Sequence, residues 1–378
     1  MKIGLVCPYN IALGGGVQEI VRALHDELAA RGHQVAIVTP QPREPHVDEG
    51  RRIIFLGSAA NVKTPLNTVA QVSASVLTDE IDSMLEHEQF DILHFHEPWV
   101  PVLSRQILSR SNTVNVATFH AKLPETVMSR TMAKVITPYT KPLLRHIDAF
   151  TAVSDAAAEY LLSLADVPVE IIPNGINLKY FAKPRSVKRP VGPKTILYVG
   201  RLEHRKGVAY LLTAFAELES RSSGVRLIIA GDGVDREKLE QQSVELGLKN
   251  VEFLGYIDEA TKRRLLHTTD LFCSPALFGE SFGVVLLEAL AAGLVIVAGD
   301  NPGYASVMEG LGQLSLIDPK DASMFAHRLQ LLLDDGDLRA LWQKWAKDYV
   351  RQFDYPKVMD RYMAVYETAR AEATKERS

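Results

Sequence analysis

The chain alternates short apolar runs with longer stretches of helical periodicity, and this alternation limits its possible folds more than any other feature. Strands that alternate with helices form parallel sheets, in which buried strands read as short apolar runs. The first series of runs comprises Ile3–Cys7, Gln34–Thr39, Ile53–Leu56, Asp91–Phe95, Val114–Phe119, Ala149–Val153 and Glu170–Ile172. The second series comprises Ile196–Val199, Val225–Ala230, Val251–Leu254, Leu271–Ser274 and Val295–Ala298. The sequence therefore predicts an α/β protein with two parallel sheets.

Between the two series, residues 182–194 contain three prolines and no apolar periodicity, which is typical of a linker. The predicted domains are therefore residues 1–181 and 195–354. From Tyr355 to about Ala371, apolar side chains recur on one helical face, so this last helix needs a partner surface.

The composition excludes several classes of protein. Of the 378 residues 47% are hydrophobic, enough for large cores, and the net charge of −4 argues against electrostatic binding of nucleic acid. The only cysteines, Cys7 and Cys273, stand in apolar runs, which predicts reduced core thiols and a cytosolic protein. No apolar run has membrane-spanning length, and the N-terminus reads as a strand instead of a signal peptide.

The segment Gly279–Gly293 carries the most specific chemical signal. Glu280 stands in a predicted loop, and Glu288 follows eight positions later in an apolar helix. The helix is expected to open at Ser281, Phe282 and Gly283. Free backbone N–H groups and the positive end of a helix dipole suit a diphosphate, and carboxylates accept hydrogen bonds from sugar hydroxyls. The spacing therefore predicts a site for a nucleotide sugar.

Each glutamate alone has a simpler interpretation, since Glu280 can cap the helix and Glu288 can be a solvated helix residue. The neighbours Val284–Ala292 are apolar almost all round the helix, which predicts that it is buried. A buried carboxylate without a partner is unfavourable, so Glu288 is predicted to face a polar ligand.

A second motif supplies positive charge. The predicted strand Thr195–Val199 leads into Gly200–Gly207, and an apolar helix starts at Val208. Arg201 and Lys206, at the end of a strand and beside a helix start, suit a departing diphosphate. A solvated basic loop is the alternative, favoured only if the motif stood alone.

In the first half, Gly14–Gly16 permit close backbone approach at a helix N-terminus, where phosphate groups can bind; a flexible loop is the alternative. The spaced glycines of the dinucleotide fingerprint are absent there, which weakens a hydride-transfer interpretation. His94 and His96 share one strand face, and His120 ends another strand, so a zinc site is conceivable. Satisfied core histidines are the simpler interpretation.

The glutamate and cation motifs together resemble the retaining nucleotide-sugar glycosyltransferases of family 4, with the GT-B fold of two facing Rossmann-like domains. Four N-terminal segments are similar to the bacterial phosphatidyl-myo-inositol mannosyltransferase branch: Met1–Tyr9, Gly14–Gln18, His94–Pro98 and Ala117–His120. The resemblance implies that the final helix, residues 355–378, crosses back onto the first, acceptor-side domain. The second domain would then bind the nucleotide sugar.

The resemblance also implies roles for particular residues. The expected catalytic residues are His120, Arg201, Lys206 and Glu280. The expected donor-binding residues are Gly15, Gly16, Ser281, Phe282, Gly283 and Glu288. The expected acceptor-binding residues are Tyr9, Gln18, Asn67, Glu97 and Lys122. No metal and no cofactor is expected, because the nucleotide sugar is a substrate and this fold needs no metal.

The implied reaction is transfer of mannose from GDP-mannose, with an α linkage, to phosphatidylinositol or another lipid-linked or polyol acceptor. UDP-glucose and UDP-N-acetylglucosamine remain open as donors. A sugar-nucleotide epimerase or a phosphorylase on the same scaffold, and a two-lobed binding protein, remain open as alternatives.

The mannosyltransferase branch contacts membranes through a basic helix, but here the corresponding residues 78–90 are acidic. A basic amphipathic stretch at Val127–His146 offers a different membrane surface, or else a helix pair packed on its own domain. The expected location is the cytoplasm, with contact at the inner face of the membrane left open.

Overall fold

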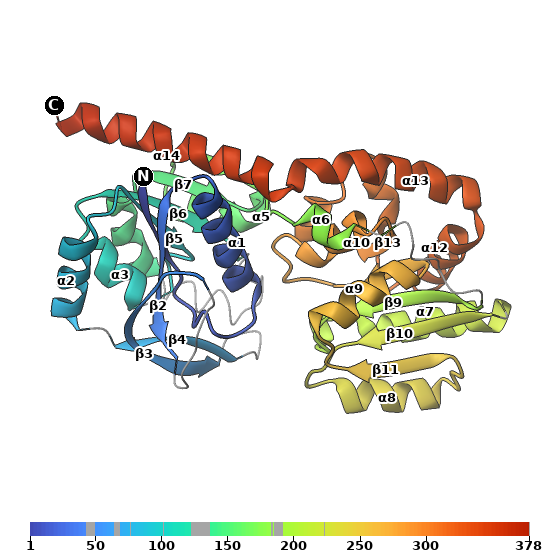
Figure 1. The fold of residues 1–378 in the computed structure, drawn as a ribbon. Coiled ribbons are helices and arrows are strands. Elements are labelled where there is room, and N and C mark those ends of the chain that lie inside the picture. The colour runs from blue at the N-terminus through green and yellow to red at the C-terminus, as the bar shows by residue number, and fades with distance from the viewer. Residues whose placement is uncertain are drawn as a thin grey trace. The chain divides into compact units, whose positions relative to one another are not determined.

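The computed structural model describes residues 1–42, 50–63, 69–75, 77–100, 102–121, 137–182, 184, 192–222 and 224–377. The chain forms two compact units, each built around one sheet (Figure 1). The first unit contains Met1–Gly175 and Tyr355–Ser378, and the second contains Ile176–Asp354.

The first unit has an eight-stranded sheet in the order β4-β3-β2-β1-β5-β6-β7-β8. Its pairs are parallel except for β3 with β4. The strands are β1 (Lys2–Val6), β2 (Gln34–Gln41), β3 (Ile53–Lys63), β4 (Val69–Ser75), β5 (Ile92–His96), β6 (Val114–Phe119), β7 (Ala149–Ala152) and β8 (Val169–Ile171). The helices are α1 (Gly16–Ala30), α2 (Thr78–Glu88), α3 (Leu103–Leu108), η1 (Lys141–His146), α5 (Asp155–Leu164) and α14 (Tyr355–Arg377).

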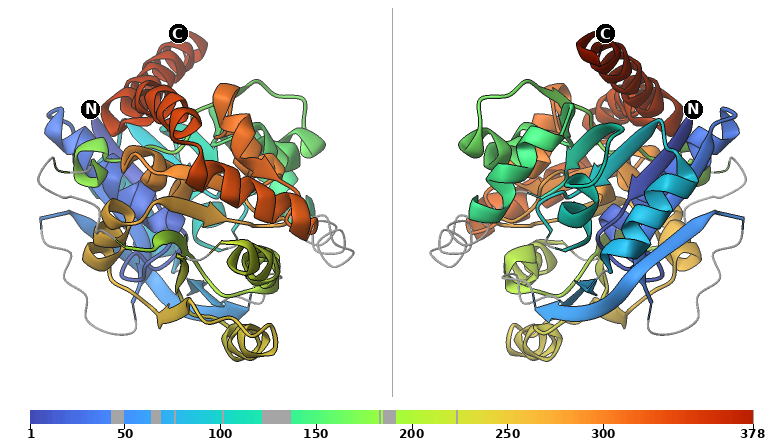
Figure 2. Two further views of the ribbon diagram at one scale, coloured as in Figure 1. Left: turned by 90° about the vertical axis from the view of Figure 1, so that its right-hand side faces the viewer. Right: turned by 90° about the vertical axis from the view of Figure 1, so that its left-hand side faces the viewer.

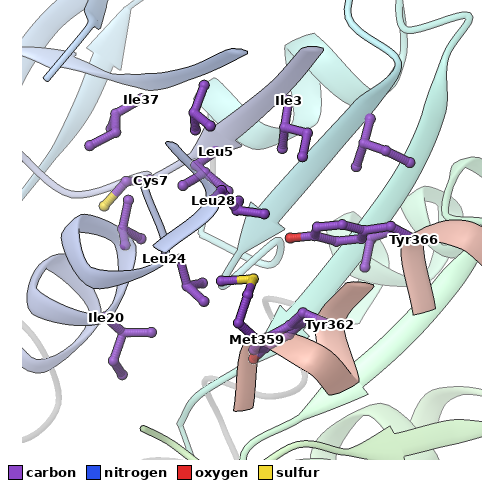
Figure 3. Packing of buried hydrophobic residues seen from close by; sticks show 14 of the residues in the cluster. Ile3, Leu5, Cys7, Ile20, Leu24, Leu28, Ile37, Met359, Tyr362 and Tyr366 are labelled. Atoms are coloured by element: carbon purple, nitrogen blue, oxygen red, sulfur yellow. The ribbon is translucent and has the colours of Figure 1, made fainter. Parts of the chain in front are cut away.

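One hydrophobic core of this unit joins β1, α1 and the C-terminal helix. Every second residue of β1 points into it, so Ile3 and Leu5 pack beside Leu24 and Leu28 of α1. Figure 3 shows Met359, Tyr362 and Tyr366 of α14 directed toward these side chains. The C-terminal end of α14 extends past the sheet (Figures 1 and 2). The expected return of the last helix to the first unit is therefore confirmed.

The second unit has a six-stranded parallel sheet in the order β11-β10-β9-β12-β13-β14. The strands are β9 (Lys194–Val199), β10 (Val225–Ala230), β11 (Val251–Gly255), β12 (Leu271–Ser274), β13 (Val295–Gly299) and β14 (Leu316–Ile317). The helices are α6 (Leu178–Phe181), η2 (His204–Lys206), α7 (Val208–Arg221), α8 (Arg236–Glu245), α9 (Glu259–Thr268), α10 (Val284–Ala291), α11 (Pro302–Ala305), η3 (Gly310–Ser315), α12 (Ala322–Asp334), α13 (Gly336–Tyr349) and η4 (Val350–Phe353).

The boundary between the units precedes the predicted one. Residues 176–181 belong to the second unit and not, as predicted, to the first. The Ile176 N–H donates to the Phe353 carbonyl at 2.8 Å, and His267 Nε2 lies 2.8 Å from the Phe181 carbonyl oxygen. These contacts tie α6 to its own unit. Of the predicted linker, the structure describes residues 182, 184 and 192–194, and Lys194 already begins β9.

Every strand predicted from an apolar run is present, with small shifts at some ends, but β3 continues to Lys63, seven residues beyond its predicted end at Leu56. The strands β4 and β14 were not predicted. The β4 sequence Val-Ala-Gln-Val-Ser-Ala-Ser mixes small and polar residues, and β14 has two residues, so neither forms an apolar run.

Candidate functional site

The order of strands reverses between β9 and β12 in the second unit, and ligands of open α/β sheets bind at such a point beyond the carboxyl ends of the strands. Residues 200–207 follow β9 and residues 275–283 follow β12, so the two predicted motifs meet there. A Cβ added to Gly207 would lie 2.0 Å from the Pro275 carbonyl oxygen. The loops therefore depend on a glycine to approach each other.

Glu280 lies in this site between two cationic side chains. Its Oε1 is 2.7 Å from Arg205 Nη1 and 2.7 Å from Lys206 Nζ. Arg205 also donates to Glu203 Oε2 at 3.0 Å, and Arg201 Nη1 lies 2.9 Å from Glu203 Oε1. Three cations and two carboxylates thus form one network with an excess of one positive charge.

The network is mostly buried, except for Arg201, whose side chain is 50% exposed. Burial lowers the pKa of Lys206, and the charges of Arg205 and Arg201 lower it further, whereas Glu280 opposes the shift. The cluster therefore has an unneutralised charge and one solvent-accessible guanidinium, the combination that suits an anionic ligand.

Arg205 was not predicted as a site residue. Its side chain is more buried than that of Lys206 and makes three contacts, to Glu203, Glu280 and the Gly279 carbonyl. The adjacent residues His204, Arg205 and Lys206 all look like a basic loop in the sequence. Only the 3-10 turn of η2 decides which side chain turns inward.

The helix α10 begins three residues later than the predicted opening at Ser281. Glu280–Gly283 form a loop, and α10 begins at Val284 with Gly283 as its N-cap. Gly283 has a φ of 106°, and a Cβ there would lie 2.7 Å from Tyr304 Cδ1, so glycine is required. Phe282 is buried, with its ring 6.1 Å from that of Phe353. Its side chain packs within the unit, leaving its backbone to serve a ligand.

Glu288 was predicted to face a polar ligand because a buried carboxylate needs a partner, but the structure provides that partner within the protein. Glu288 Oε1 lies 2.8 Å from Lys262 Nζ of α9, and both side chains are largely buried. Burial lowers the Lys262 pKa, but Glu288 and Glu259 outweigh it and raise the pKa overall. No sequence pattern predicted this pairing, because the two residues are on different helices.

In the first unit, the strand order reverses between β1 and β5. Gly15 is the N-cap of α1, and the added Cβ of Gly16 would meet no atom within 4 Å. The Gln18 side chain folds back over Gly15, where its Oε1 lies 2.3 Å from the position of an added Cβ. Tyr9 is partly buried, and burial together with the Glu97 charge raises its pKa. These predicted residues therefore share one region.

The three histidines form a buried row from β5 to the end of β6. The rings of His94 and His96 have centroids 4.2 Å apart, and His96 Nδ1 lies 2.8 Å from His120 Nε2. His94 Nδ1 is 2.7 Å from the Tyr366 hydroxyl of α14, and its Nε2 is 2.6 Å from Thr118 Oγ1. Burial lowers the pKa of His94 and His120 to about 3, so both are neutral at neutral pH.

Among the described residues, no group of three His, Cys, Asp or Glu side chains has an arrangement that could hold a metal ion. Glu97 is 1% exposed, and its Oε1 accepts the backbone N–H of His120 at 2.6 Å. Asn67 and Lys122 lie outside the described residues, and their predicted roles at the acceptor site stay predictions.

The acidic segment, residues 78–90, contains α2. Four acidic side chains of this helix are exposed: Asp79, Glu80, Asp82 and Glu86. The basic stretch Val127–His146 is described only from residue 137 onward. None of the helices in the described part of the chain is long and apolar enough to cross a membrane.

Two family models match the chain. The model for glycosyl transferases group 1 matches residues 180–349, and the model for glycosyltransferase family 4 matches residues 14–180. The chain is 35% identical over 372 residues to the phosphatidyl-myo-inositol mannosyltransferase of Mycolicibacterium smegmatis, across 97% of this chain and 94% of the relative. It is 33% identical over 383 residues to that of Mycobacterium tuberculosis, across 99% of both chains.

Solved structures share the fold. Sucrose-phosphate synthase from Thermosynechococcus elongatus superposes with a TM-score of 0.77 at 22% identity, across 98% of this chain and 99% of that one. Anabaena Alr3699/HepE in complex with UDP gives a TM-score of 0.76 at 18% identity, across 97% and 100% of the chains.

Two Rossmann-like units, with a cationic cluster where the second sheet reverses its order, define a glycosyltransferase of the GT-B class. This chain belongs to glycosyltransferase family 4 and is a hexosyltransferase.

Proposed function

We propose that this chain transfers mannose from GDP-mannose to the inositol ring of phosphatidylinositol, with retention at the anomeric carbon. The proposal rests mainly on one observation: almost the whole chain is similar to relatives that are named phosphatidyl-myo-inositol mannosyltransferases. The cationic cluster of the second unit supports the use of a diphosphate leaving group.

In the proposed reaction, the bond between the anomeric carbon and the diphosphate oxygen breaks. A bond to an inositol hydroxyl oxygen forms on the same face of the sugar. The hydroxyl proton passes to the departing diphosphate oxygen, so no protein base is needed. Arg201 and Lys206 stabilise the developing charge on the leaving group, and the Arg205 charge adds to theirs.

The remaining predicted residues bind the two substrates. Glu280 accepts hydrogen bonds from the mannose hydroxyls, and Glu288, oriented by Lys262, from the ribose. His120 contacts the transferred sugar through Nδ1, which is buried and has no hydrogen-bond partner among the described residues. Tyr9 and Gln18 bind the inositol headgroup, whereas Gly15 and Gly16 allow close approach of the donor's phosphate groups.

Because phosphatidylinositol resides in a bilayer, the protein would contact the membrane peripherally. The exposed acidic side chains of α2 repel anionic lipid, so we place that contact on another surface of the first unit. The acceptor therefore determines where the enzyme works, at the inner face of the membrane.

The test is transfer of radiolabel to phosphatidylinositol vesicles from GDP-mannose, UDP-glucose or UDP-N-acetylglucosamine in parallel. Label in the lipid from GDP-mannose alone is expected. Label from a UDP-sugar would overturn the donor assignment, and altered donor sugar without acceptor would indicate an epimerase. Arg201→Ala should lower the rate about 100-fold, whereas the exposed Arg226 of β10 offers a matched control in Arg226→Ala.

A further inference from the structure

Glu97, immediately after β5, has an unusual backbone conformation for a glutamate. Its φ is 53°, in the left-handed region that residues other than glycine, asparagine and aspartate rarely adopt. Its own N–H donates to the Thr118 carbonyl at 2.9 Å, so the residue stays in register with β6 while the chain turns. A strained residue of this kind persists only where its surroundings hold it.

The left-handed turn points the Glu97 side chain toward the end of the neighbouring strand, β6. Glu97 Oε1 accepts the backbone N–H of His120 at 2.6 Å, one residue after β6 ends. Burial raises the Glu97 pKa to about 7, and the N–H groups of His120 and Ala121 and the Trp99 side chain only partly offset this. The carboxyl group is therefore held inside the unit, with 1% of the residue exposed.

The His120 ring is held from the same strand. His96 Nδ1 lies 2.8 Å from His120 Nε2, and the two rings stack with centroids 5.1 Å apart. Since burial keeps both rings neutral, one nitrogen of the pair donates and the other accepts. The end of β5 and the residue after it thus hold His120, at its ring through His96 and at its backbone through Glu97.

We propose that Glu97 is a positioning residue that fixes the His120 backbone and so aims its ring, instead of contacting the acceptor as the sequence suggested. The inference rests on the proposed function, because it takes His120 as the group that contacts the transferred sugar. Glu97 Oε1 is taken by the His120 N–H, and Oε2, which has no hydrogen-bond partner among the described residues, is buried as well. With 1% of the residue exposed, the carboxyl group offers little surface to an inositol ring. Misplacing a contact of this kind by about 1 Å can lower turnover about 100-fold.

Three variants separate the side chain from the strained backbone. Glu97→Gly relieves the left-handed strain but removes the acceptor oxygen, and Glu97→Asn tolerates the same φ but is one methylene too short. Glu97→Gln keeps an oxygen for the His120 N–H. Gln89→Gly is the matched control, because Gln89 has a φ of 47° and is exposed at the end of α2.

With GDP-mannose and phosphatidylinositol vesicles, Glu97→Gly and Glu97→Asn should lower kcat about 100-fold, with the KM for phosphatidylinositol unchanged. Glu97→Gln should restore most of that loss, and Gln89→Gly should match the natural protein. A higher KM for phosphatidylinositol at unchanged kcat would show that Glu97 binds the acceptor and would overturn the proposal. Full activity in Glu97→Gly would overturn it as well.

A second readout does not depend on the substrate. In protein labelled with ¹⁵N-histidine, the short bond to a carboxylate should move the His120 amide proton downfield, and His120→Asn assigns the signal by its loss. The signal should move upfield in Glu97→Gly and stay downfield in Glu97→Gln. An unmoved signal in Glu97→Gly would refute the positioning role of Glu97, whether or not the natural protein transfers mannose. Absence of mannose transfer by the natural protein would refute only the proposed function.

Discussion

One carboxylate oxygen of Glu280, Oε1, pairs with two cationic side chains, Arg205 and Lys206, each 2.7 Å away. All three side chains are largely buried, so their charges are stable only together. A diphosphate that approaches Arg201 enters a region where positive charge already exceeds negative charge. Glu280 is therefore the structural counter-charge of Arg205 and Lys206 within the proposed site of the leaving group.

Glu280→Gln should lower kcat for mannosyl transfer about 100-fold, because the amide keeps the shape but loses the charge that organises Arg205 and Lys206. The free energy of unfolding should fall by about 3–5 kcal/mol, since two buried cations lose their partner. Steady-state kinetics and urea unfolding measure the two effects. Glu252→Gln, on an exposed position of β11, should change neither, and unchanged turnover in Glu280→Gln would refute the assigned role.

His94 gives a pH prediction. Its pKa is lowered to about 3 by burial and by the nearby His120, so the unfolded chain binds one more proton than the folded one between about pH 3 and 6.5. Stability from His94 is therefore lost as pH falls through this window. Glu97, with a raised pKa of about 7, acts in the opposite sense between its ordinary value and pH 7.

His94→Gln should make the dependence of the unfolding free energy on pH shallower by about 1.4 kcal/mol per pH unit. Urea unfolding between pH 5 and 6 measures this slope in both proteins. Glu97 contributes about equally to the slope of each, so the difference between the slopes reports His94. Equal slopes would mean that His94 takes up its proton normally in the folded state.

Sequence reasoning identified Lys206, Glu280 and the loop before α10, because local spacing encodes them. It missed Arg205 and Lys262, because the position of Arg205 depends on the turn of η2 and Lys262 meets Glu288 across two helices, α9 and α10. Which of several neighbouring cations turns inward is a property of tertiary structure.

Among the elements, α14 shows how a helix distant in sequence completes a core. Its tyrosines bring hydroxyl groups to the sheet as well as apolar area, and Tyr366 meets His94 at 2.7 Å. Burial raises the pKa of Tyr362 to about 12, and interactions with Thr118 and Thr151 of the sheet partly oppose this shift. The amphipathic pattern predicted the helix and its need for a surface. The identity of that surface followed only from the family resemblance.

Tyr366→Phe should lower the free energy of unfolding by about 1–3 kcal/mol, because it leaves His94 Nδ1 buried without a partner. Thermal or urea unfolding checks the change. Tyr256 is 85% exposed, so Tyr256→Phe is the matched control and should have no effect. An equally small change in both variants would mean that the His94 bond adds no net stability.

At the scale of the whole molecule, two sheets each carry proposed site residues beyond the carboxyl ends of their strands. The sequence predicted both sheets because buried parallel strands are continuous apolar runs. It misplaced the boundary between the units, because α6 is tied to its unit by the distant residues His267 and Phe353. In the proposed function, the positive charge that meets the diphosphate comes from Arg201, Arg205 and Lys206.

Transfer should therefore persist in excess EDTA, since these side chains supply the charge that a divalent cation otherwise provides. The measurement compares initial rates of label transfer with and without chelator, and again after adding back Mg²⁺ or Mn²⁺. Loss of activity in EDTA with recovery on adding a metal would refute metal-independent transfer.

The most direct measurement is the structure of the lipid product formed from GDP-[¹³C]mannose and phosphatidylinositol. Mass spectrometry should find one labelled hexose on the inositol lipid, and the one-bond carbon–proton coupling at the labelled anomeric carbon should identify an α linkage. A β linkage would contradict retention, and a labelled free sugar with unmodified lipid would contradict transfer to this acceptor.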